Sequence, residues 1–460
     1  MRTNNLHLRM SGKQHEALMK HLLPEDGKEA AAIALCGRLT GKNKTCIMIR
    51  KLVLVPYDTC RARENDLLIW PTDLLIPLLE EAEACGGGIL KLHSHPGGWE
   101  DFSILDDKAD RSFFGSVYSW LDTDDPHASV ILLPDGRLIG RVVDVSGNFT
   151  PLASISVAGD DINIWRVSSN FKPTTGQLFA RGTRDLLSEL TIGVVGCSGT
   201  GSFVVELLAR QGVGGLVLVD PDRVEERNLN RIINSTLQDA QDNRLKVDVA
   251  ADAVDRIGFG TDVKTFPHLL GEAGTIEALS ECDIVVGCVD SHSGRHTLNR
   301  LATYYSIPYF DVGVRIDPDG KGGVESVWGA IHYLQPGGSS VLSRGAVSME
   351  GVRAESLKQS DPAGYEEQRR AGYIIGVKEE QLAVVSANAY FASKLLNEIL
   401  ARLHPFRDEP NSNYAQQRFN LAQNEEFLDP YDEPCEALLR YVGRGDVVPL
   451  LGLAGLSRAA

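Results

Sequence analysis

Residues 191–220 read TIGVVGCSGTGSFVVELLARQGVGGLVLVD, and this stretch decides the fold. The apolar run at 191–195 is typical of a short buried strand, and a glycine-rich turn follows it. The pattern then predicts a helix over 202–210 and a second strand over 216–220. A strand, a helix and a strand within about 30 residues form a right-handed βαβ unit of a parallel sheet. The sequence therefore predicts an α/β fold for this part of the chain.

The glycine-rich turn also indicates a nucleotide site. Gly196, Gly199 and Gly201 let the backbone approach phosphate groups, and the N-terminus of the next helix attracts negative charge. Asp220 ends the second strand, where a carboxylate can accept hydrogen bonds from ribose hydroxyls. These features suit NAD and ATP equally well, so the glycine pattern alone leaves both ligands open.

The next residues along the chain distinguish the two ligands. Asp220 and Asp222 form a D-x-D pair, and residues 228–231 read Asn-Leu-Asn-Arg. Together they resemble the signature of the ThiF/MoeB and ubiquitin-activating enzymes. The resemblance implies a Rossmann-like, mostly parallel-sheet adenylation domain that uses ATP, and it argues against an NAD-dependent oxidoreductase.

The same resemblance assigns roles to single residues. It implies that Asn228 and Arg231 bind the nucleotide, that Lys246 neutralises phosphate charge and that Asp290 holds Mg²⁺. Cations at the phosphates stabilise the charge that develops in nucleotidyl transfer, and Mg²⁺ prefers oxygen ligands. Arg181 resembles an arginine that members lend to the ATP of the partner subunit in a homodimer, although a solvated arginine explains it equally well. A further position, 198, carries serine where the family usually has glycine; a small side chain there still permits binding.

A second motif lies at residues 93–106, which read HSHPGGWEDFSILD. Two histidines at i and i+2 on a strand point to the same face, so His93 and His95 can reach one ion. Ser103 can cap a following helix and place Asp106 in its first turn. Three protein ligands and a water form the open, catalytic kind of zinc site. Each half of the motif by itself has a structural explanation, a helix cap or a chance pair of histidines.

The two halves at this spacing resemble the JAMM motif of the MPN/JAB metallopeptidases, over residues 10–150. The resemblance implies that His93, His95 and Asp106 hold Zn²⁺ and that Ser103 steadies the tetrahedral intermediate. It also implies a general base upstream. Glu29 stands at the matching place, and Glu25 is the competing candidate.

Cysteines are missing where relatives of the adenylating enzymes carry them. Two C-x-x-C pairs would bind structural zinc, but Ser340 and Ser343 replace the first pair and only Cys435 remains of the second. A thioester-forming cysteine is also missing, because the chain has none between Cys288 and Cys435. Ser340, Ser343 or Ser348 could form an oxyester instead. The simpler expectation is direct transfer from the acyl-adenylate to another protein.

These motifs predict two enzyme domains. We expect an MPN/JAB α/β domain over 1–155, a connector over 156–185, an adenylation domain over 186–401 and an extended tail over 402–460. Strands are predicted at 46–55, 88–92, 129–133 and 283–289, and helices at 73–85 and 380–401.

The composition indicates which classes of partner and which cellular compartment to expect. A net charge of -16 argues against nucleic acid and anionic membranes as main partners. No apolar run reaches the roughly 20 residues of a membrane span, and the N-terminal residues have no signal-peptide core. The eight cysteines show no disulfide spacing. We therefore expect a cytoplasmic protein with reduced thiols.

The preferred interpretation is a bifunctional enzyme of a bacterial ubiquitin-like system. Its adenylating domain would activate the C-terminus of a ubiquitin-like protein, and its peptidase would trim the precursor or release the protein from targets. A conjugating-enzyme-like protein is a further expected partner. Two alternatives remain: an adenylyltransferase for sulfur-carrier proteins in biosynthesis, and a non-catalytic scaffold. The missing thiols disfavour the first, and the intact motifs disfavour the second.

Overall fold

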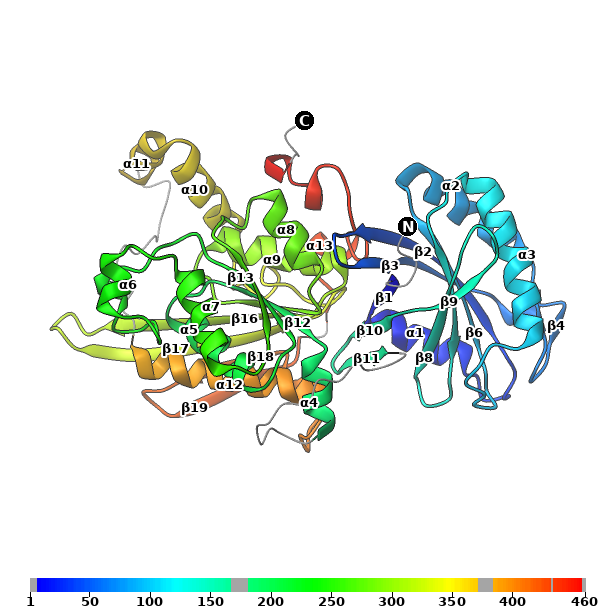
Figure 1. The fold of residues 1–460 in the computed structure, drawn as a ribbon, viewed down its shortest axis with the longest axis horizontal. Helices are drawn as coiled ribbons and strands as arrows, with labels where there is room; N and C mark the ends of the chain where they lie inside the picture. Colours follow the sequence, from blue (N-terminus) through cyan, green and yellow to red (C-terminus); the bar gives the residue numbers. More distant parts are fainter. Residues whose placement is uncertain (1–5, 167–180, 371–383, 432, 457–460) are drawn as a thin grey trace. The chain divides into compact units, whose positions relative to one another are not determined.

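The computed structural model describes residues 6–166, 181–370, 384–431 and 433–456. The chain forms two compact units (Figure 1). Unit 1 comprises Met1–Ser169, Thr303–Ser306 and Arg440–Leu451, and unit 2 comprises Asn170–Ala302, Ile307–Leu439 and Gly452–Ala460. In the described part of the chain, no helix has the length and apolar character needed to cross a membrane.

Unit 1 is built on a mixed nine-stranded sheet with the strand order β11-β10-β1-β3-β2-β6-β7-β8-β9. Its strands are β1 (Leu6–Ser11), β2 (Ala31–Thr40), β3 (Thr45–Leu54), β6 (Gly88–Ser94), β7 (His127–Leu132), β8 (Leu138–Val143), β9 (Phe149–Pro151), β10 (Ser154–Ala158) and β11 (Ile162–Arg166). Its helices are α1 (Gly12–Leu22), α2 (Ile76–Cys85) and α3 (Ile104–Leu121). A separate hairpin joins β4 (Ala62–Arg63) to β5 (Leu68–Ile69).

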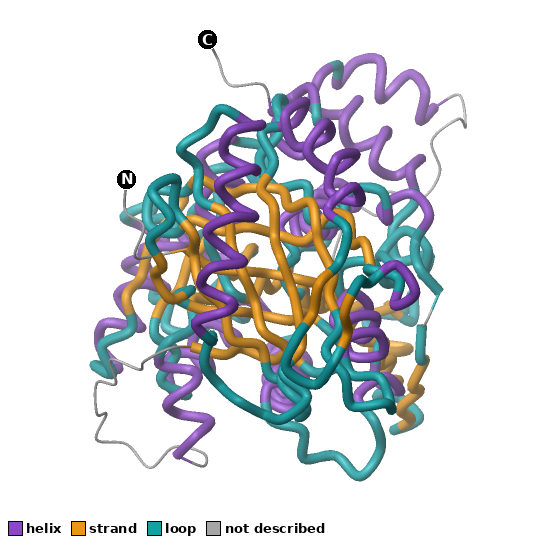
Figure 2. Tube along the Cα trace, turned by 90° about the vertical axis from the view of Figure 1, so that its right-hand side faces the viewer, coloured by secondary structure: helices purple, strands orange, loops and turns teal. Residues whose placement is uncertain are grey.

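The central strand β2 explains the layering of unit 1. Successive side chains of a strand point to opposite faces, and β2 is apolar on both. Ala32 and Ala34 belong to the core that includes Leu18 of α1. Ile33 and Leu35 belong to a second core, which α2 and α3 cover. The sheet thus lies between two helical layers, and Figure 2 shows helices lying over the strands.

Unit 2 contains an eight-stranded sheet with the order β14-β13-β12-β15-β16-β17-β18-β19. Its strands are β12 (Thr191–Val195), β13 (Gly215–Val219), β14 (Asp262–Phe266), β15 (Ile284–Gly287), β16 (Tyr309–Pro318), β17 (Val324–Leu334), β18 (Gln416–Asn420) and β19 (Glu425–Asp429). The helices between residues 181 and 439 are α4 (Arg181–Ser188), α5 (Gly199–Arg210), α6 (Leu237–Gln241), α7 (Lys246–Ile257), α8 (Ala273–Ser280), α9 (His292–Tyr305), α10 (Met349–Ser360), α11 (Pro362–Arg370), α12 (Val385–Leu403) and α13 (Glu436–Leu439).

The βαβ unit predicted from residues 191–220 is present as β12, α5 and β13, with β12 and β13 parallel. The four strand pairs from β14 to β16 in the sheet order are parallel, and β16 then pairs antiparallel with β17. Chain order reverses beside β12, since β13 and β14 lie on one side and β15 and β16 on the other. Ligands of such sheets bind at the carboxyl ends of the strands near this reversal.

The structure differs from the sequence predictions at both ends of the adenylation domain. The expected connector over 156–185 contains the end of β10 and all of β11, which extend the sheet of unit 1. The expected tail over 402–460 contains β18 and β19, which continue the sheet of unit 2 in antiparallel fashion. These short strands were missed because β10 and β18 join the sheets through β1 and β17, which are distant in sequence, and β11 and β19 are added beyond them.

Candidate functional sites

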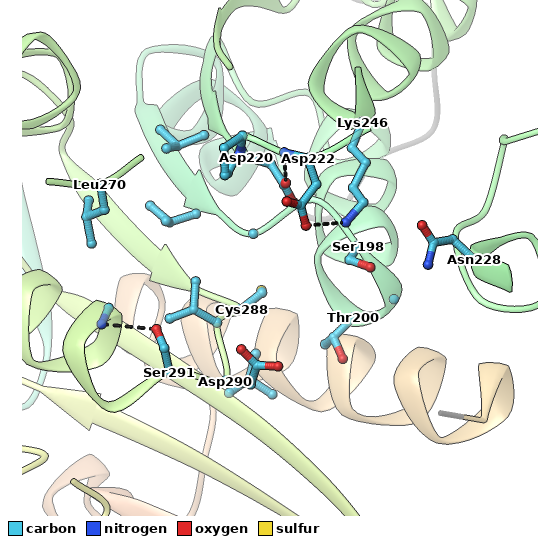
Figure 3. A pocket seen from close by; sticks show the side chains of 18 of the residues that line it. Ser198, Thr200, Asp220, Asp222, Asn228, Lys246, Leu270, Cys288, Asp290 and Ser291 are labelled. Carbon is cyan, nitrogen blue, oxygen red and sulfur yellow. Dashed lines mark hydrogen bonds and ion pairs between the residues drawn. The ribbon is translucent and has the colours of Figure 1, made fainter. Parts of the chain in front are cut away.

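Unit 2 has a cavity of about 470 Å³ at the carboxyl ends of β12, β13 and β15. Figure 3 shows the labelled side chains of this nucleotide cavity, and in it Lys246 reaches Asp222. Most of the residues predicted to bind the nucleotide line it: Gly196, Gly199, Asp220, Asp222, Asn228, Arg231, Lys246 and Asp290. Residues that are up to 94 positions apart in the sequence thus meet at the point where the topology places a ligand.

The glycine-rich turn requires its glycines for different reasons. Gly196 has φ +91°, a left-handed conformation that favours glycine. A Cβ at Gly199 would lie 2.5 Å from Nδ2 of Asn388. Gly201 was predicted to contact the nucleotide, but it does not line the cavity. A Cβ there would lie 1.7 Å from the carbonyl oxygen of Gly196, so Gly201 allows the helix to pack against the turn.

Asp220 is held firmly at the end of β13. Its carboxylate accepts hydrogen bonds from the backbone N–H groups of Cys197, at 2.7 Å, and Asp222, at 2.9 Å. Burial raises the pKa of Asp220 above its ordinary value. Each oxygen accepts one backbone bond and keeps a lone pair, so the carboxylate can still accept hydroxyl groups of a ribose.

The charged side chains of the nucleotide cavity differ in burial and in their partners. Lys246 is only 7% exposed, and its Nζ lies 2.7 Å from Oδ2 of Asp222. Asp290 is exposed, and no hydrogen bond or ion pair to another described residue occupies its carboxylate. Arg231 donates from Nη1 to the carbonyl oxygen of Arg227 at 3.0 Å. The cavity therefore offers a preorganised ammonium group for phosphates and a free carboxylate for a cation.

Several cavity residues were not predicted. Thr200 donates a hydrogen bond to Asn388 of α12 at 3.1 Å, and both line the cavity. Leu269 and Leu270 line it from the loop after β14. The rule that ligands bind at strand carboxyl ends would have indicated this loop, had β14 been recognised. Asn388 had no local signal, since α12 reaches the turn only through the tertiary fold.

Two further predictions concern Arg181 and the turn that contains Ser340 and Ser343. Arg181 begins α4, but its side chain lies outside the described residues. Ser340 and Ser343 hold their turn by reciprocal bonds, because each backbone N–H donates to the other hydroxyl, at 2.9 and 3.0 Å. The backbone N–H of Cys435 donates to the carbonyl oxygen of Gly338 at 2.9 Å. Hydrogen bonds therefore hold together the two segments in which relatives were expected to carry zinc-binding cysteines.

Unit 1 brings His93, His95 and Asp106 together. The histidines follow the alternation of β6, and Asp106 lies in the first turn of α3, which Ser103 caps as predicted. Nε2 of His93 lies 3.1 Å from Nε2 of His95 and 3.1 Å from Oδ1 of Asp106. Nε2 of His95 lies 3.6 Å from Oδ2 of Asp106.

These distances fit a tetrahedral metal ion. Ligand atoms at zinc–nitrogen and zinc–oxygen distances of about 2.0–2.1 Å, set at tetrahedral angles, lie about 3.3 Å apart. The two histidine nitrogens lie 3.1 Å apart, and each lies within 3.6 Å of one oxygen of the Asp106 carboxylate, His93 near Oδ1 and His95 near Oδ2. All ligand atoms of this group lie within 4.8 Å of one another. The geometry can therefore accept a small divalent cation without a change in backbone path.

Surrounding groups orient these ligands. Nδ1 of His95 donates to the carbonyl oxygen of Trp99 at 2.8 Å, which leaves Nε2 of the neutral ring as the acceptor. Burial lowers the pKa of His93 and favours its neutral form. Although burial opposes ionisation of Asp106, hydrogen bonds with His93 and His95 hold the pKa of its carboxyl well below the usual range. Ser103 donates to Oδ2 of Asp106 at 2.7 Å, so its hydroxyl belongs to the cap.

Glu29 lies next to this group because of strand register. Strand β2 pairs antiparallel with β6, with Ala31 opposite His93, and Ser94 donates its N–H to Ala30 at 3.1 Å. If this register is continued by two residues beyond the end of β2, Glu29 stands opposite His95. Burial raises the pKa of Glu29 to about 7; the charge of His95 acts in the opposite direction, and that of Asp106 adds to the rise. Glu25, in contrast, is exposed on the surface.

A buried ionic cluster fixes the helix that carries Asp106. Asp110, one turn further along α3, is fully buried and lies 2.7 Å from Nζ of Lys91 and 2.7 Å from Nη2 of Arg141. Lys91 comes from β6 and Arg141 from β8. The cluster ties α3 to two strands of the sheet and thereby sets the position of Asp106 above His93.

We expect Asp110→Ala to destabilise unit 1 by about 3–5 kcal/mol, because it leaves the buried Lys91 without its carboxylate and removes one of the two carboxylates that pair with Arg141. Denaturant unfolding followed by tryptophan fluorescence measures the change. Asp101→Ala, at an exposed position before α3, is the control and should unfold like the unmodified protein. Equal stability of Asp110→Ala and the control would show that the cluster does not hold α3.

Similarity to known proteins identifies the family of the chain. The profile of the ThiF family matches residues 174–435, which is more than half of the sequence. The chain is 26% identical over 239 residues to "Ubiquitin-like modifier-activating enzyme 5" of Drosophila willistoni, covering 46% of this chain and 56% of the relative. It is 31% identical over 143 residues to "Adenylyltransferase and sulfurtransferase UBA4" of Meyerozyma guilliermondii, covering 31% of each. The chain thus spans about half or less of the length of these relatives.

Among solved structures, Escherichia coli MccB in complex with MccA-N7isoASN resembles the chain with a TM-score of 0.44 and 16% identity. The similarity covers 56% of this chain and 69% of that chain.

Proposed function

The chain belongs to the ThiF family, and on that premise we propose that unit 2 uses ATP and Mg²⁺ to adenylate the carboxyl terminus of a ubiquitin-like protein. The single observation that carries the proposal is the cavity in which Asp220, Lys246 and Asp290 meet at the carboxyl edge of the parallel strands. The similarity to a ubiquitin-like modifier-activating enzyme and to an adenylyltransferase supports this substrate class.

The proposed reaction follows from the placement of these side chains. A carboxylate oxygen of the substrate attacks the α-phosphorus of ATP, the bond from that phosphorus to the bridging oxygen breaks, and pyrophosphate leaves with the electron pair. Lys246 and Arg231 offset the negative charge of the phosphates. Asp220 would accept hydrogen bonds from the ribose hydroxyls, and Asp290 would supply an oxygen ligand to Mg²⁺. The product is an acyl-adenylate with a mixed anhydride bond.

A sulfur-carrier protein is the alternative substrate, and the name of the yeast relative favours it. Both substrates end in a carboxylate, so the first chemical step is the same. The second step differs, because sulfur transfer uses thiols. Among the described residues of unit 2, the cysteines are buried or deep in the cavity, and we therefore favour a ubiquitin-like partner, with direct transfer or transfer through a conjugating-enzyme-like protein.

We further propose that unit 1 is a zinc peptidase of the JAMM type, which cleaves after the carboxyl terminus of the same partner. His93, His95 and Asp106 would hold the ion, whose charge polarises a scissile carbonyl and acidifies water. Glu29 would take the proton from the attacking water and deliver it to the leaving amine. The separations of the three ligand atoms and the register that brings Glu29 opposite His95 support this assignment.

The thiols lead to a prediction about covalent intermediates. Burial raises the pKa of Cys197 and of Cys288, so neither is an effective thiolate nucleophile, and Cys282 and Cys435 are buried. We expect that incubation with ATP and a ubiquitin-like partner produces an AMP ester but no adduct of this chain that dithiothreitol cleaves. Non-reducing gels with and without dithiothreitol make the measurement.

The gels distinguish three results. An adduct that dithiothreitol removes would contradict the prediction and point to one of the cysteines. An adduct that resists dithiothreitol but is lost in mild base would indicate an oxyester. Ser340→Ala, Ser343→Ala and Ser348→Ala would then locate it, although the hydroxyl of Ser348 already accepts a hydrogen bond from Gly351 at 3.0 Å.

We also infer a homodimer, because the resemblance implies that this family pairs through the adenylation domain. In the assembled dimer, Arg181 would contact the ATP of the neighbouring subunit. Light scattering at working concentrations should give twice the mass of the chain. A monomer that retains full ATP–pyrophosphate exchange would contradict this inference.

A further inference from the structure

A second cavity of about 770 Å³ adjoins the nucleotide cavity in unit 2. Arg295, Gly313 and Val314 line both cavities, so the two spaces meet at these residues. The second cavity lies over the antiparallel strands β16, β17 and β18, which supply Trp328, His332 and other lining residues. A chain whose end reaches the nucleotide through this junction would place its preceding residues in the second cavity.

The lining of this cavity contains buried polar atoms without partners. His332 of β17 pairs in register with Gln416 of β18, so both side chains lie on one face of the sheet. They are 3% and 7% exposed. Among the described residues, Nδ1 of His332 and Oε1 of Gln416 have no hydrogen-bond partner. Since leaving a buried polar atom unpaired costs about 1–3 kcal/mol, these atoms indicate a place for a polar ligand.

Arg344 adds an uncompensated charge to the same lining. Its guanidinium donates to the hydroxyl of Ser339 at 2.9 Å and to the carbonyl oxygens of Ala415 at 2.7 Å and Tyr333 at 2.9 Å. A guanidinium has five N–H groups, so two remain, one on each terminal nitrogen. Over the described ranges of the chain, no carboxylate forms an ion pair with Arg344. Burial lowers the pKa of Arg344 to about 10, as expected for a cation short of a counter-ion.

Positive side chains outnumber negative ones in the lining of the second cavity. Four arginines and one aspartate line it: Arg295, Arg315, Arg344, Arg418 and Asp317. Three of these arginines have carboxylate partners, since Arg295 lies 3.5 Å from Asp311, Arg315 lies 2.9 Å from Asp317 and Arg418 lies 3.0 Å from Asp429. This positive lining stands in a chain whose net charge is -16. A buried cation is stabilised when a ligand brings the opposite charge, and arginine binds carboxylates in bidentate fashion.

We propose that the second cavity binds the last residues of the substrate tail and selects a tail with an acidic side chain, whose carboxylate pairs with Arg344. The inference rests on the proposed adenylation, because that reaction explains why a polypeptide end approaches the junction at Arg295. An extended chain advances about 3.3 Å per residue, so the acidic residue stands within the last few positions before the terminus. His332 and Gln416 would bind the same carboxylate or a neighbouring backbone amide.

The test compares matched octapeptides that end in glycine and carry either Glu or Gln at the second, third or fourth position from the end. ATP–pyrophosphate exchange gives the KM of each peptide, and fluorescence anisotropy of labelled peptides gives the Kd independently of chemistry. A charge-assisted bond to a buried arginine predicts that one Glu peptide has a KM and a Kd at least about tenfold lower than its Gln partner.

Variants of the protein connect this preference to Arg344. In Arg344→Gln, the Glu and Gln peptides should have about the same KM and the same Kd. Arg353→Gln, at an exposed position of α10 that does not line the cavity, should keep the preference of the unmodified protein. If Arg344→Gln does not fold, the peptide comparison in the unmodified chain still decides the matter.

The outcomes separate the inference from the proposed function. Exchange that proceeds equally with Glu and Gln peptides at every position would overturn the inference and leave adenylation standing. If the Glu peptide binds more tightly but no exchange occurs, the result would support the inferred role of the second cavity and contradict adenylation. Peptides that neither bind nor support exchange would contradict both.

Discussion

Lys246→Ala and Asp290→Ala are each expected to lower ATP–pyrophosphate exchange by about 10²–10³-fold or more, while peptidase cleavage continues at its original rate. Lys246 is the buried ammonium group of the nucleotide cavity, and Asp290 is its free carboxylate. Neither residue belongs to unit 1, which contains the histidine and aspartate group. Exchange of radioactive pyrophosphate into ATP measures the first activity, and cleavage of a ubiquitin-like fusion protein measures the second.

Two neighbouring residues serve as matched controls. Lys264 and Asp262 are exposed on β14 and do not line the cavity, so Lys264→Ala and Asp262→Ala should keep both activities. If exchange persists in both Lys246→Ala and Asp290→Ala, or if it depends on NAD, the proposed ATP site is wrong. Loss of cleavage together with exchange would show that the two units do not act separately.

Glu29→Gln is expected to reduce cleavage of the fusion protein by about 10²–10⁴-fold and to leave the bound zinc in place. The amide keeps the size of the side chain but cannot take a proton from water. Because Glu29 is not among the three residues whose ligand atoms converge, metal analysis of this variant should still find one zinc ion per chain. His95→Ala should instead lose both zinc and cleavage.

The competing base provides the control for this experiment. Glu25 is exposed and precedes Glu29 by four residues, so Glu25→Gln should retain full cleavage. Full activity of Glu29→Gln would exclude it as the base. Loss of cleavage in Glu25→Gln alone would transfer the role to that residue. Exchange of pyrophosphate should be normal in both variants, which also shows that unit 2 is intact.

The features predicted well from the sequence depend on local spacing. The cap that Ser103 forms with Asp106 spans three residues, and the two histidines follow the two-residue repeat of a strand. The turn at Gly196 likewise lies between a strand and a helix that are adjacent in sequence. In each case the chemistry and the backbone geometry come from one short segment, so the segment predicts both.

The features that were missed depend on distant partners. Asn388 contacts Gly199 and Thr200 only because α12 packs beside α5. Strands β18 and β19 carry polar and aromatic side chains, so nothing in their own sequence marks them as part of a sheet begun near residue 191. The ionic cluster of Asp110 needs β6 and β8 as well as α3. Gly201 was instead assigned a function that it does not have in the structure. The glycine pattern predicted a contact with phosphate, whereas Gly201 allows the helix to pack against the turn.

Mass spectrometry of the substrate tests the central claim most directly. The chain is incubated with Mg²⁺, ATP and a ubiquitin-like protein with a free carboxyl terminus, and the reaction is quenched in acid to preserve a mixed anhydride. The account predicts a substrate species heavier by one adenylyl group, which requires ATP and is absent with Lys246→Ala. No such species in the presence of bound ATP and bound substrate would contradict adenylation of the carboxyl terminus by this chain.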